Sequence, residues 1–154
     1  MNEQDFINFD ELYFNEYKGW GEVPATVWDM TVWDKNTDQP KVVAEADDPY
    51  ELMTSLAEYG ITNGAILAVR GWGAPLEEDQ NPKDSIRPSL HPKRKRMVIY
   101  LHIENVNGNL TVAIHPEDEE LMLMNERGVG SLADAIFKAV RKVQRKINKS
   151  LPRK

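Results

Sequence analysis

One hairpin pattern in the second half of the chain restricts the fold more than any other feature. Met97–Glu104 is the clearest strand pattern in the sequence, and Asn109–Ile114 is a second strand that follows it closely. Asn107-Gly108 lies between them, and this pair favours a type I′ turn because both central residues of that turn have positive φ. We therefore predict an antiparallel hairpin at the centre of a larger sheet.

Other segments are expected to extend this sheet. Ala25–Trp33 alternates between apolar and polar side chains, as a half-buried strand does, and the polar residues after it predict a loop into a strand over Lys41–Glu45. Ala65–Val69 is a short continuous apolar run, which is typical of a central strand buried on both faces. With a further strand over Glu120–Asn125, the sheet is predicted to have about five to six strands.

Helical patterns flank the predicted strands. Asp48 caps a helix whose apolar stripe ends before Gly60, and Ser131 caps an amphipathic helix near the end of the chain. A short helix is expected over Phe6–Phe14, within an otherwise irregular segment over residues 1–24. The predicted helices and strands together form an α+β fold, in which helices pack on one face of a mostly antiparallel sheet.

Length and composition support one domain and exclude several classes of protein. A chain of 154 residues suits a single domain over residues 1–154, and the absence of cysteine excludes disulfides and Cys-ligated metal centres. No apolar run is long enough to cross a bilayer, and Met1–Asp10 is acidic, without the basic-then-apolar pattern of a secretion signal. We therefore expect a cytoplasmic protein that does not bind a membrane and has no cofactor.

Charge is distributed unevenly along the chain. Residues 1–80 carry 17 acidic and four basic side chains, whereas residues 81–154 carry eight acidic and 15 basic ones, giving a net charge of −6. Residues 127–154 are the most basic part, with nine basic side chains and Asp134 as their one acidic side chain. Such asymmetry either attracts a charged partner or is neutralised inside the molecule, and the sequence leaves both readings open.

Three motifs carry a resemblance to known proteins. They are the run Val69–Pro75 (VRGWGAP), the run Arg87–Arg96 (RPSLHPKRKR) before an apolar strand, and the run Gly130–Ala135 (GSLADA). In this order they resemble a group of small uncharacterised proteins from actinobacteria and their phages, over roughly Asp48–Val140. The resemblance implies a cytoplasmic setting, and it implies no activity, cofactor or catalytic residue.

The hairpin supplies the first candidate site. With Asn107-Gly108 at the centre of the turn, Tyr100 is expected to face His115. The polar residues of this face are expected on its outer side, and they are Tyr100, His102, Glu104 and His115. His102, His115 and Glu104 could bind a divalent metal, or the cluster could exchange protons near neutral pH. The alternative reading is a solvated sheet face without chemistry.

A long loop over residues 71–95 supplies the second candidate site. Its four prolines oppose regular structure, and loops of this length are often functional. Trp72 could offer an aromatic plane to a ligand, while Arg87 and His91 could contact phosphate. The alternative is that Trp72 covers the core and that the acidic run Glu77–Asp79 is only solvated.

Basic residues supply the third candidate site. They are Lys93, Arg94 and Arg96 before the strand, and Lys138, Arg141, Lys142 and Arg145 on the outer face of the last helix. These residues could contact nucleic acid, but no aromatic side chain interleaves with them as base stacking requires. An acidic protein surface suits the helix equally well. Another protein is therefore the first expected partner, and nucleic acid is the second.

These observations favour a small, non-enzymatic interaction protein, and the resemblance implies that a phage or its host encodes it. It is expected to recognise a charged partner through its acidic N-terminal half and its basic C-terminal helix. The sequence has no Gly-rich phosphate loop, no G-x-S-x-G motif and no H-E-x-x-H motif. Two alternatives remain: a metal-dependent or acid–base enzyme that uses the hairpin cluster, and an acidic inhibitor that imitates nucleic acid.

Overall fold

A computed structural model describes residues 2–34, 39–56, 64–73, 95–103 and 110–123, together with Arg145. In chain order its elements are α1 (Glu3–Glu16), β1 (Ala25–Asp34), β2 (Gln39–Ala46), the 3-10 helix η1 (Pro49–Leu52), β3 (Ala65–Gly73), β4 (Lys95–Ile103), β5 (Leu110–Pro116) and β6 (Met122–Leu123). Residues 53–56 continue η1 as helix. None of the described helices is long and apolar enough to cross a membrane.

The strands form one open sheet in the order β2-β1-β3-β4-β5-β6, and all neighbouring strands are antiparallel. The predicted α+β class and the predicted number of strands are therefore confirmed. β3 lies between β1 and β4, and its residues Ala65–Ala68 are fully buried. This confirms that the continuous apolar run marks a central strand, since only a strand covered on both faces can bury consecutive side chains.

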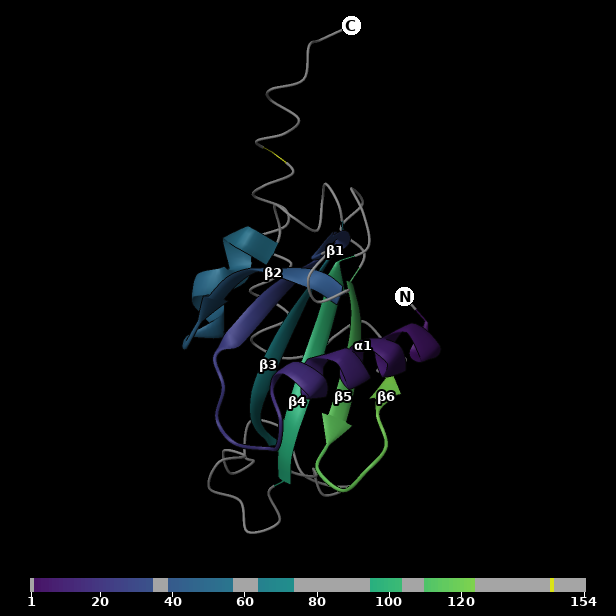
Figure 1. Ribbon diagram of the computed structural model, residues 1–154. Coiled ribbons are helices and arrows are strands. Elements are labelled where there is room, and N and C mark those ends of the chain that lie inside the picture. The colour runs from purple at the N-terminus through teal and green to yellow at the C-terminus, as the bar shows by residue number, and fades with distance from the viewer. Residues whose placement is uncertain are drawn as a thin grey trace, which may run out of the picture.

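Helix α1 lies across one face of the sheet (Figure 1). It begins with a capping box in which Asn2 accepts from the Asp5 amide and Asp5 accepts from the Asn2 amide. Phe6, Phe9 and Tyr13 follow at helical spacing and are buried against the sheet. The helix is longer than the predicted Phe6–Phe14, so the prediction of a largely irregular segment over residues 1–24 is wrong.

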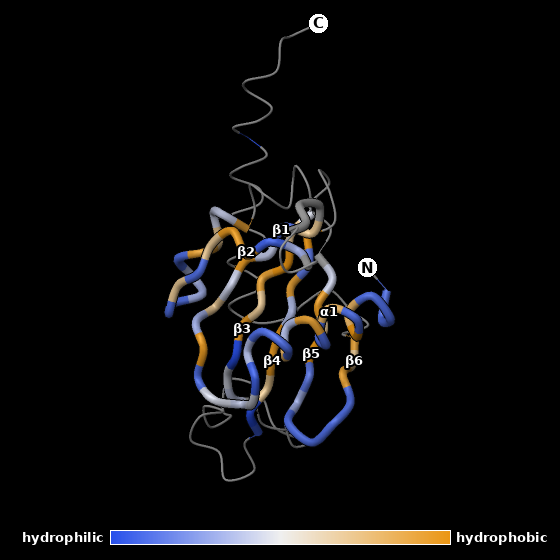
Figure 2. Tube along the Cα trace, in the orientation of Figure 1, coloured by the Kyte–Doolittle hydropathy of each residue, from blue (hydrophilic) through white to orange (hydrophobic). Residues whose placement is uncertain are grey.

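The sheet is covered on both faces. One core cluster lies under α1 and consists of Phe6, Phe9, Tyr13, Trp28, Ile66, Ala68, Val98, Tyr100 and Ala113. The alternate strand residues point the other way and pack with Leu52, Met53 and Leu56. The two described helices thus lie on opposite faces rather than sharing one. Figure 2 shows apolar stretches along the strands that α1 crosses.

The hairpin register differs from the prediction by two residues. Tyr100 pairs with Ala113 instead of His115, and His102 pairs with Thr111. A shift of two keeps every side chain on its predicted face, because side chains alternate with a period of two. The predicted partners are wrong, but Tyr100, His102 and His115 still belong to the same face.

Two other boundaries differ from the prediction. β3 continues to Gly73 because Gly71 pairs with Met97 and Trp72 pairs with Arg96, so residues 71–73 and Lys95 are strand rather than loop. A strand is predicted over Glu120–Asn125. Of the described residues 120–123 in this stretch, only Met122 and Leu123 form a strand, β6. The predicted helix after Ser131 lies outside the described residues, except for Arg145, which is helical and exposed.

Candidate functional site

Asp10 joins helix α1 to two neighbouring strands. The Tyr100 hydroxyl of β4 donates a hydrogen bond to Oδ1 of Asp10. The ring atom Nδ1 of His115, on β5, lies 2.9 Å from both carboxylate oxygens of Asp10. The carboxylate therefore fixes the orientation of the imidazole and leaves Nε2, the second ring nitrogen, turned away from it.

Aromatic rings hold His115 from the other sides. The ring of Phe14 lies 5.5 Å from that of His115, and the ring of Trp20 lies 5.2 Å from it, both close to perpendicular. The His115 side chain is 21% exposed and that of Asp10 is 14% exposed. The His115 imidazole is therefore oriented by a carboxylate, packed by two rings and partly open to water.

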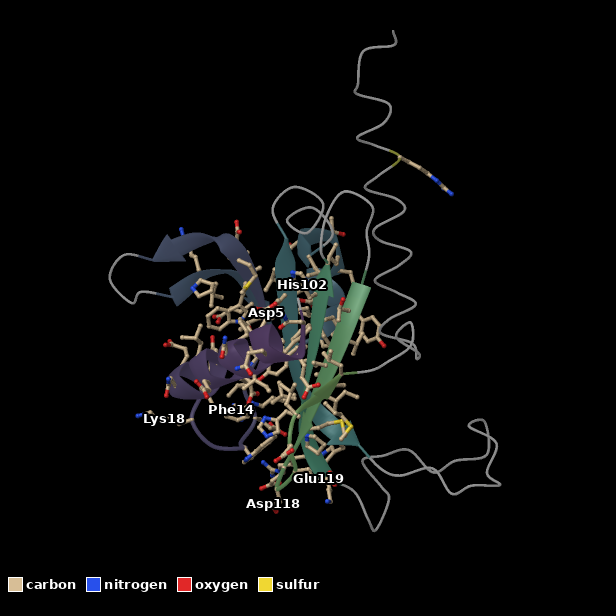
Figure 3. All side chains as sticks on the ribbon, turned by 90° about the vertical axis from the view of Figure 1, so that its right-hand side faces the viewer. Asp5, Phe14, Lys18, His102, Asp118 and Glu119 are labelled. Carbon is tan, nitrogen blue, oxygen red and sulfur yellow. The ribbon has the colours of Figure 1, made fainter. Side chains whose placement is uncertain are left out.

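A pocket of about 720 Å³ opens beside this cluster. Its lining includes the aromatic residues Phe14 and Trp20, and the carboxylates of Asp10, Glu11, Asp118, Glu119 and Glu120. Figure 3 shows Phe14 on the side of the molecule that carries the turn residues Asp118 and Glu119. We call this cavity the acidic pocket. It brings helix α1 together with a turn more than 100 residues later in the chain.

A second pocket, of about 620 Å³, shares Trp20 with the acidic pocket in its lining. Its lining includes Arg70, Trp72 and Arg96 from the paired strands β3 and β4. The guanidinium of Arg96 lies 5.1 Å from the centre of the Trp72 ring. We call this cavity the arginine pocket. It unites Trp72 and Arg96, which the sequence placed in two separate candidate sites.

Arg70 attaches the segment after α1 to the sheet. Its guanidinium donates to the carbonyls of Tyr17, Gly19 and Gly21 at 2.6–2.8 Å, and its Nε donates to the Tyr13 hydroxyl at 3.2 Å. The same group lies 5.2–5.3 Å from the rings of Tyr13 and Phe14. Arg70 thereby fixes the segment that carries Trp20, and Trp20 lines both pockets.

The predicted hairpin cluster is only partly brought together. Tyr100 and His115 meet through Asp10, whereas His102 lies farther along the sheet against the ring of Phe6 (Figure 3). The predicted exposure of this face is wrong, because α1 covers it and leaves Tyr100 0% and His102 7% exposed. Glu104 lies outside the described residues. Among those described, no group of three histidine or acidic side chains is placed to hold a metal ion.

Most of the other predicted binding residues fall outside the described part of the chain. These residues are Arg87, His91, Lys93, Arg94, Lys138, Arg141 and Lys142, as well as the acidic run Glu77–Asp79. Lys95, beside Arg94 in sequence, forms an ion pair with Glu119 at 3.5 Å. One positive charge of the basic run is therefore already matched by a carboxylate within the molecule.

Sequence reasoning missed both Asp10 and Arg70 as site residues. Asp10 lies four residues after Phe6 and three before Tyr13, so it belongs to the buried side of α1. Arg70 continues the alternate positions Ile66 and Ala68 that face the helix. A charged residue in an apolar stripe implies a buried partner, and this signal could have identified both.

Three tyrosines near the site are expected to resist ionisation at high pH. Burial, together with the Asp10 carboxylate, raises the pKa of Tyr100 above its usual value of 10.0. Burial also raises the pKa of Tyr13 and of Tyr17. The folded state thus holds these protons more tightly than the unfolded state. The resulting stabilisation is complete below about pH 10 and is lost as the pH rises above it.

Urea unfolding at several pH values tests this expectation for Tyr100. Above about pH 10 the free energy of unfolding should fall more steeply in the wild type than in Tyr100→Phe, by up to about 1.4 kcal/mol per pH unit. Equal slopes in the two proteins would show that Tyr100 ionises as freely in the folded state as in the unfolded one.

No protein-family model, curated protein or solved structure matches this chain.

Proposed function

We propose that this protein is a small, non-enzymatic binding module that recognises a positively charged segment of a partner protein through its acidic N-terminal half. The acidic pocket is the proposed contact point. The observation that carries this proposal is the lining of that pocket, which includes five carboxylates and two aromatic side chains. Carboxylates attract the charged ends of lysine and arginine, and aromatic rings accept both their cations and their apolar stems.

Much of this negative charge is not matched within the described residues. Among these residues, Asp10 contacts His115, and Glu119 pairs with Lys95. Glu11, Asp118 and Glu120 have no cationic group within ion-pair distance in the described part of the chain. All three side chains are exposed, so a cationic ligand can approach them directly, and their combined negative field favours it.

A protein partner fits the charge distribution better than a small cation does. The acidic surplus extends over residues 1–80. Its negative field therefore acts over an area larger than one pocket, which suits a protein surface. We extend the proposal, on the sequence alone, to the basic segment 127–154, which would meet an acidic surface of the partner. We also propose a cytoplasmic location, in line with a chain that lacks cysteine.

Charge reversal in the acidic pocket is expected to abolish binding of a basic peptide. The full chain should bind fluorescein-labelled hexa-arginine at low salt, and the affinity should fall as salt screens the charges. Glu11→Lys combined with Glu120→Lys replaces two attractive charges by two repulsive ones. Fluorescence anisotropy should then show an affinity at least about tenfold lower, equivalent to about 1.4 kcal/mol.

A matched double variant distinguishes the effect of charges in the acidic pocket from the effect of the net charge of the protein. Glu3→Lys combined with Glu51→Lys changes the net charge equally, but both residues are exposed and neither lines the pocket. This control should bind hexa-arginine within about twofold of the wild type, because distant exposed charges are screened. Equal losses in the two double variants, or equal binding of hexa-glutamate, would contradict the proposal.

Acid–base catalysis is a second candidate function, which the contact between Asp10 and His115 favours. A carboxylate that orients an imidazole is a common arrangement for general-base chemistry. The imidazole borders a pocket large enough for a small substrate. A substrate that is turned over, with turnover lost on replacing His115 by asparagine, would move the assignment from binding to catalysis.

A further inference from the structure

The arginine pocket is built differently from the acidic pocket and calls for a different ligand. Its volume of about 620 Å³ lies within the range of small-molecule sites. Among the described residues, Trp20 is the one lining residue that the two pockets share. The arginine pocket lies at the end of the sheet where β3 pairs with the start of β4.

The two arginines of this pocket are held by carbonyl groups rather than by carboxylates. Arg70 donates to three backbone carbonyls, and Nη1 of Arg96 donates to the Trp20 carbonyl at 2.6 Å. In the described part of the chain, neither arginine has a carboxylate within ion-pair distance. Carbonyls orient a guanidinium without cancelling its charge, and the two carboxylates of the lining, Glu22 and Asp47, lie beyond ion-pair distance of both arginines.

An aromatic plane lies beside these charges. Trp72 is 40% exposed, and its ring lies against the Arg96 guanidinium. A planar ligand ring can stack on exposed tryptophan while its anionic substituent meets the neighbouring arginine. Glu22 and Asp47 also line the pocket, and they could accept hydrogen bonds from amino groups of such a ring.

We propose that the arginine pocket binds a nucleotide, with the phosphate on Arg96 and the base against Trp72. Phosphate suits this site because its oxygens can accept several bonds from guanidinium groups. The nucleotide can be free or part of a single strand. This site does not depend on the acidic pocket.

Calorimetric titration of the full chain tests this site with three probes: AMP, a short oligothymidylate and inorganic phosphate. AMP should bind saturably and more tightly than inorganic phosphate, because only AMP has a base to stack on Trp72. Tighter binding of the oligothymidylate than of AMP would identify a strand as the ligand, and the reverse order would identify a free nucleotide. Failure of both to bind saturably would overturn the proposal.

Two variants locate the phosphate and the base. Arg96→Gln should weaken AMP binding at least about tenfold, because it removes a charge-assisted contact. Trp72→Leu should weaken AMP binding but leave phosphate binding within about twofold, since phosphate does not stack. AMP binding that survives both substitutions would contradict the proposal.

Neighbouring variants serve as controls. Lys95→Gln removes the same charge one residue away, but Lys95 pairs with Glu119 and does not line the arginine pocket. It should change AMP affinity by less than about twofold, since a charge already paired adds little to the field in the pocket.

Because Arg96 also binds the Trp20 carbonyl, Arg96→Lys provides a variant that keeps the charge and a donor. It should retain more AMP affinity than Arg96→Gln, and equal loss in the two would overturn the role of the charge.

This site and the acidic pocket are expected to fail or succeed independently. Arg96→Gln should leave hexa-arginine binding unchanged, and the Glu11 and Glu120 charge reversals should not weaken AMP binding, since neither residue lines the arginine pocket. If each of these variants lost binding of both AMP and hexa-arginine, the proposal of two separate sites would be contradicted.

Discussion

Arg70→Leu is expected to lower the free energy of unfolding by about 2–4 kcal/mol, because each hydrogen bond from a charged group contributes about 1.5–3 kcal/mol and such contributions are not additive. Leucine keeps an apolar stem but removes every donor to the three backbone carbonyls and to the Tyr13 hydroxyl. Water can hydrate part of the exposed segment after α1, and this limits the loss. Urea unfolding measures the change.

Lys41→Leu is the matched control for Arg70→Leu. Lys41 is an exposed cation on β2, and its loss should change stability by less than about 0.5 kcal/mol. Arg70→Lys should fall between the two, since an ammonium keeps the charge but cannot reach the separate carbonyls as a planar fork does. If Arg70→Leu were as stable as the control, the segment carrying Trp20 would not depend on Arg70.

The second large effect is expected for Asp10→Ala, at about 2–4 kcal/mol of unfolding free energy. The Tyr100 side chain is fully buried, so its hydroxyl would lose its acceptor, at a cost of about 1–3 kcal/mol. The contact with the His115 imidazole would be lost as well. Urea unfolding at about pH 8 keeps the tyrosines protonated and measures the sum of these losses.

A double-mutant cycle separates the buried hydroxyl from the rest of the Asp10 effect. In Asp10→Ala combined with Tyr100→Phe, the orphaned hydroxyl is absent. The double variant should therefore be no less stable than Asp10→Ala alone, with a coupling of at least about 1 kcal/mol between the two sites. Strictly additive losses would mean that the Tyr100 hydroxyl gains nothing from Asp10.

The hairpin illustrates how far the sequence pattern specifies the structure. Alternation over Met97–Glu104 and Asn109–Ile114 correctly assigned two antiparallel strands and the face of each residue that the structure describes in them. It assigned the wrong partners, because the pairing depends on the conformation of the turn as well as on the alternation. The prediction that Tyr100 faces His115 failed for this reason, although both residues reach Asp10.

The covering of the polar face was harder to predict. A face with Tyr100, His102 and His115 is typical of a solvated sheet surface, and only the docking of α1 makes it a buried one. The sequence contains an apolar helical stripe formed by Phe6, Phe9 and Tyr13. The stripe alone does not indicate which surface of the sheet it packs against. The acidic pocket could not be predicted from the sequence either. Glu11 and Glu120 come to line the same pocket only because α1 packs on the sheet.

NMR of the histidine side chains tests binding at the acidic pocket most directly. The chain has three histidines, so a sample labelled at histidine gives few signals, which a His115→Gln variant assigns. Adding hexa-arginine should shift the His115 signal, which borders the pocket, and leave that of the buried His102 in place. Peptide binding that leaves His115 unmoved, or that shifts it equally in the Glu11→Lys and Glu120→Lys double variant, would contradict binding at this pocket.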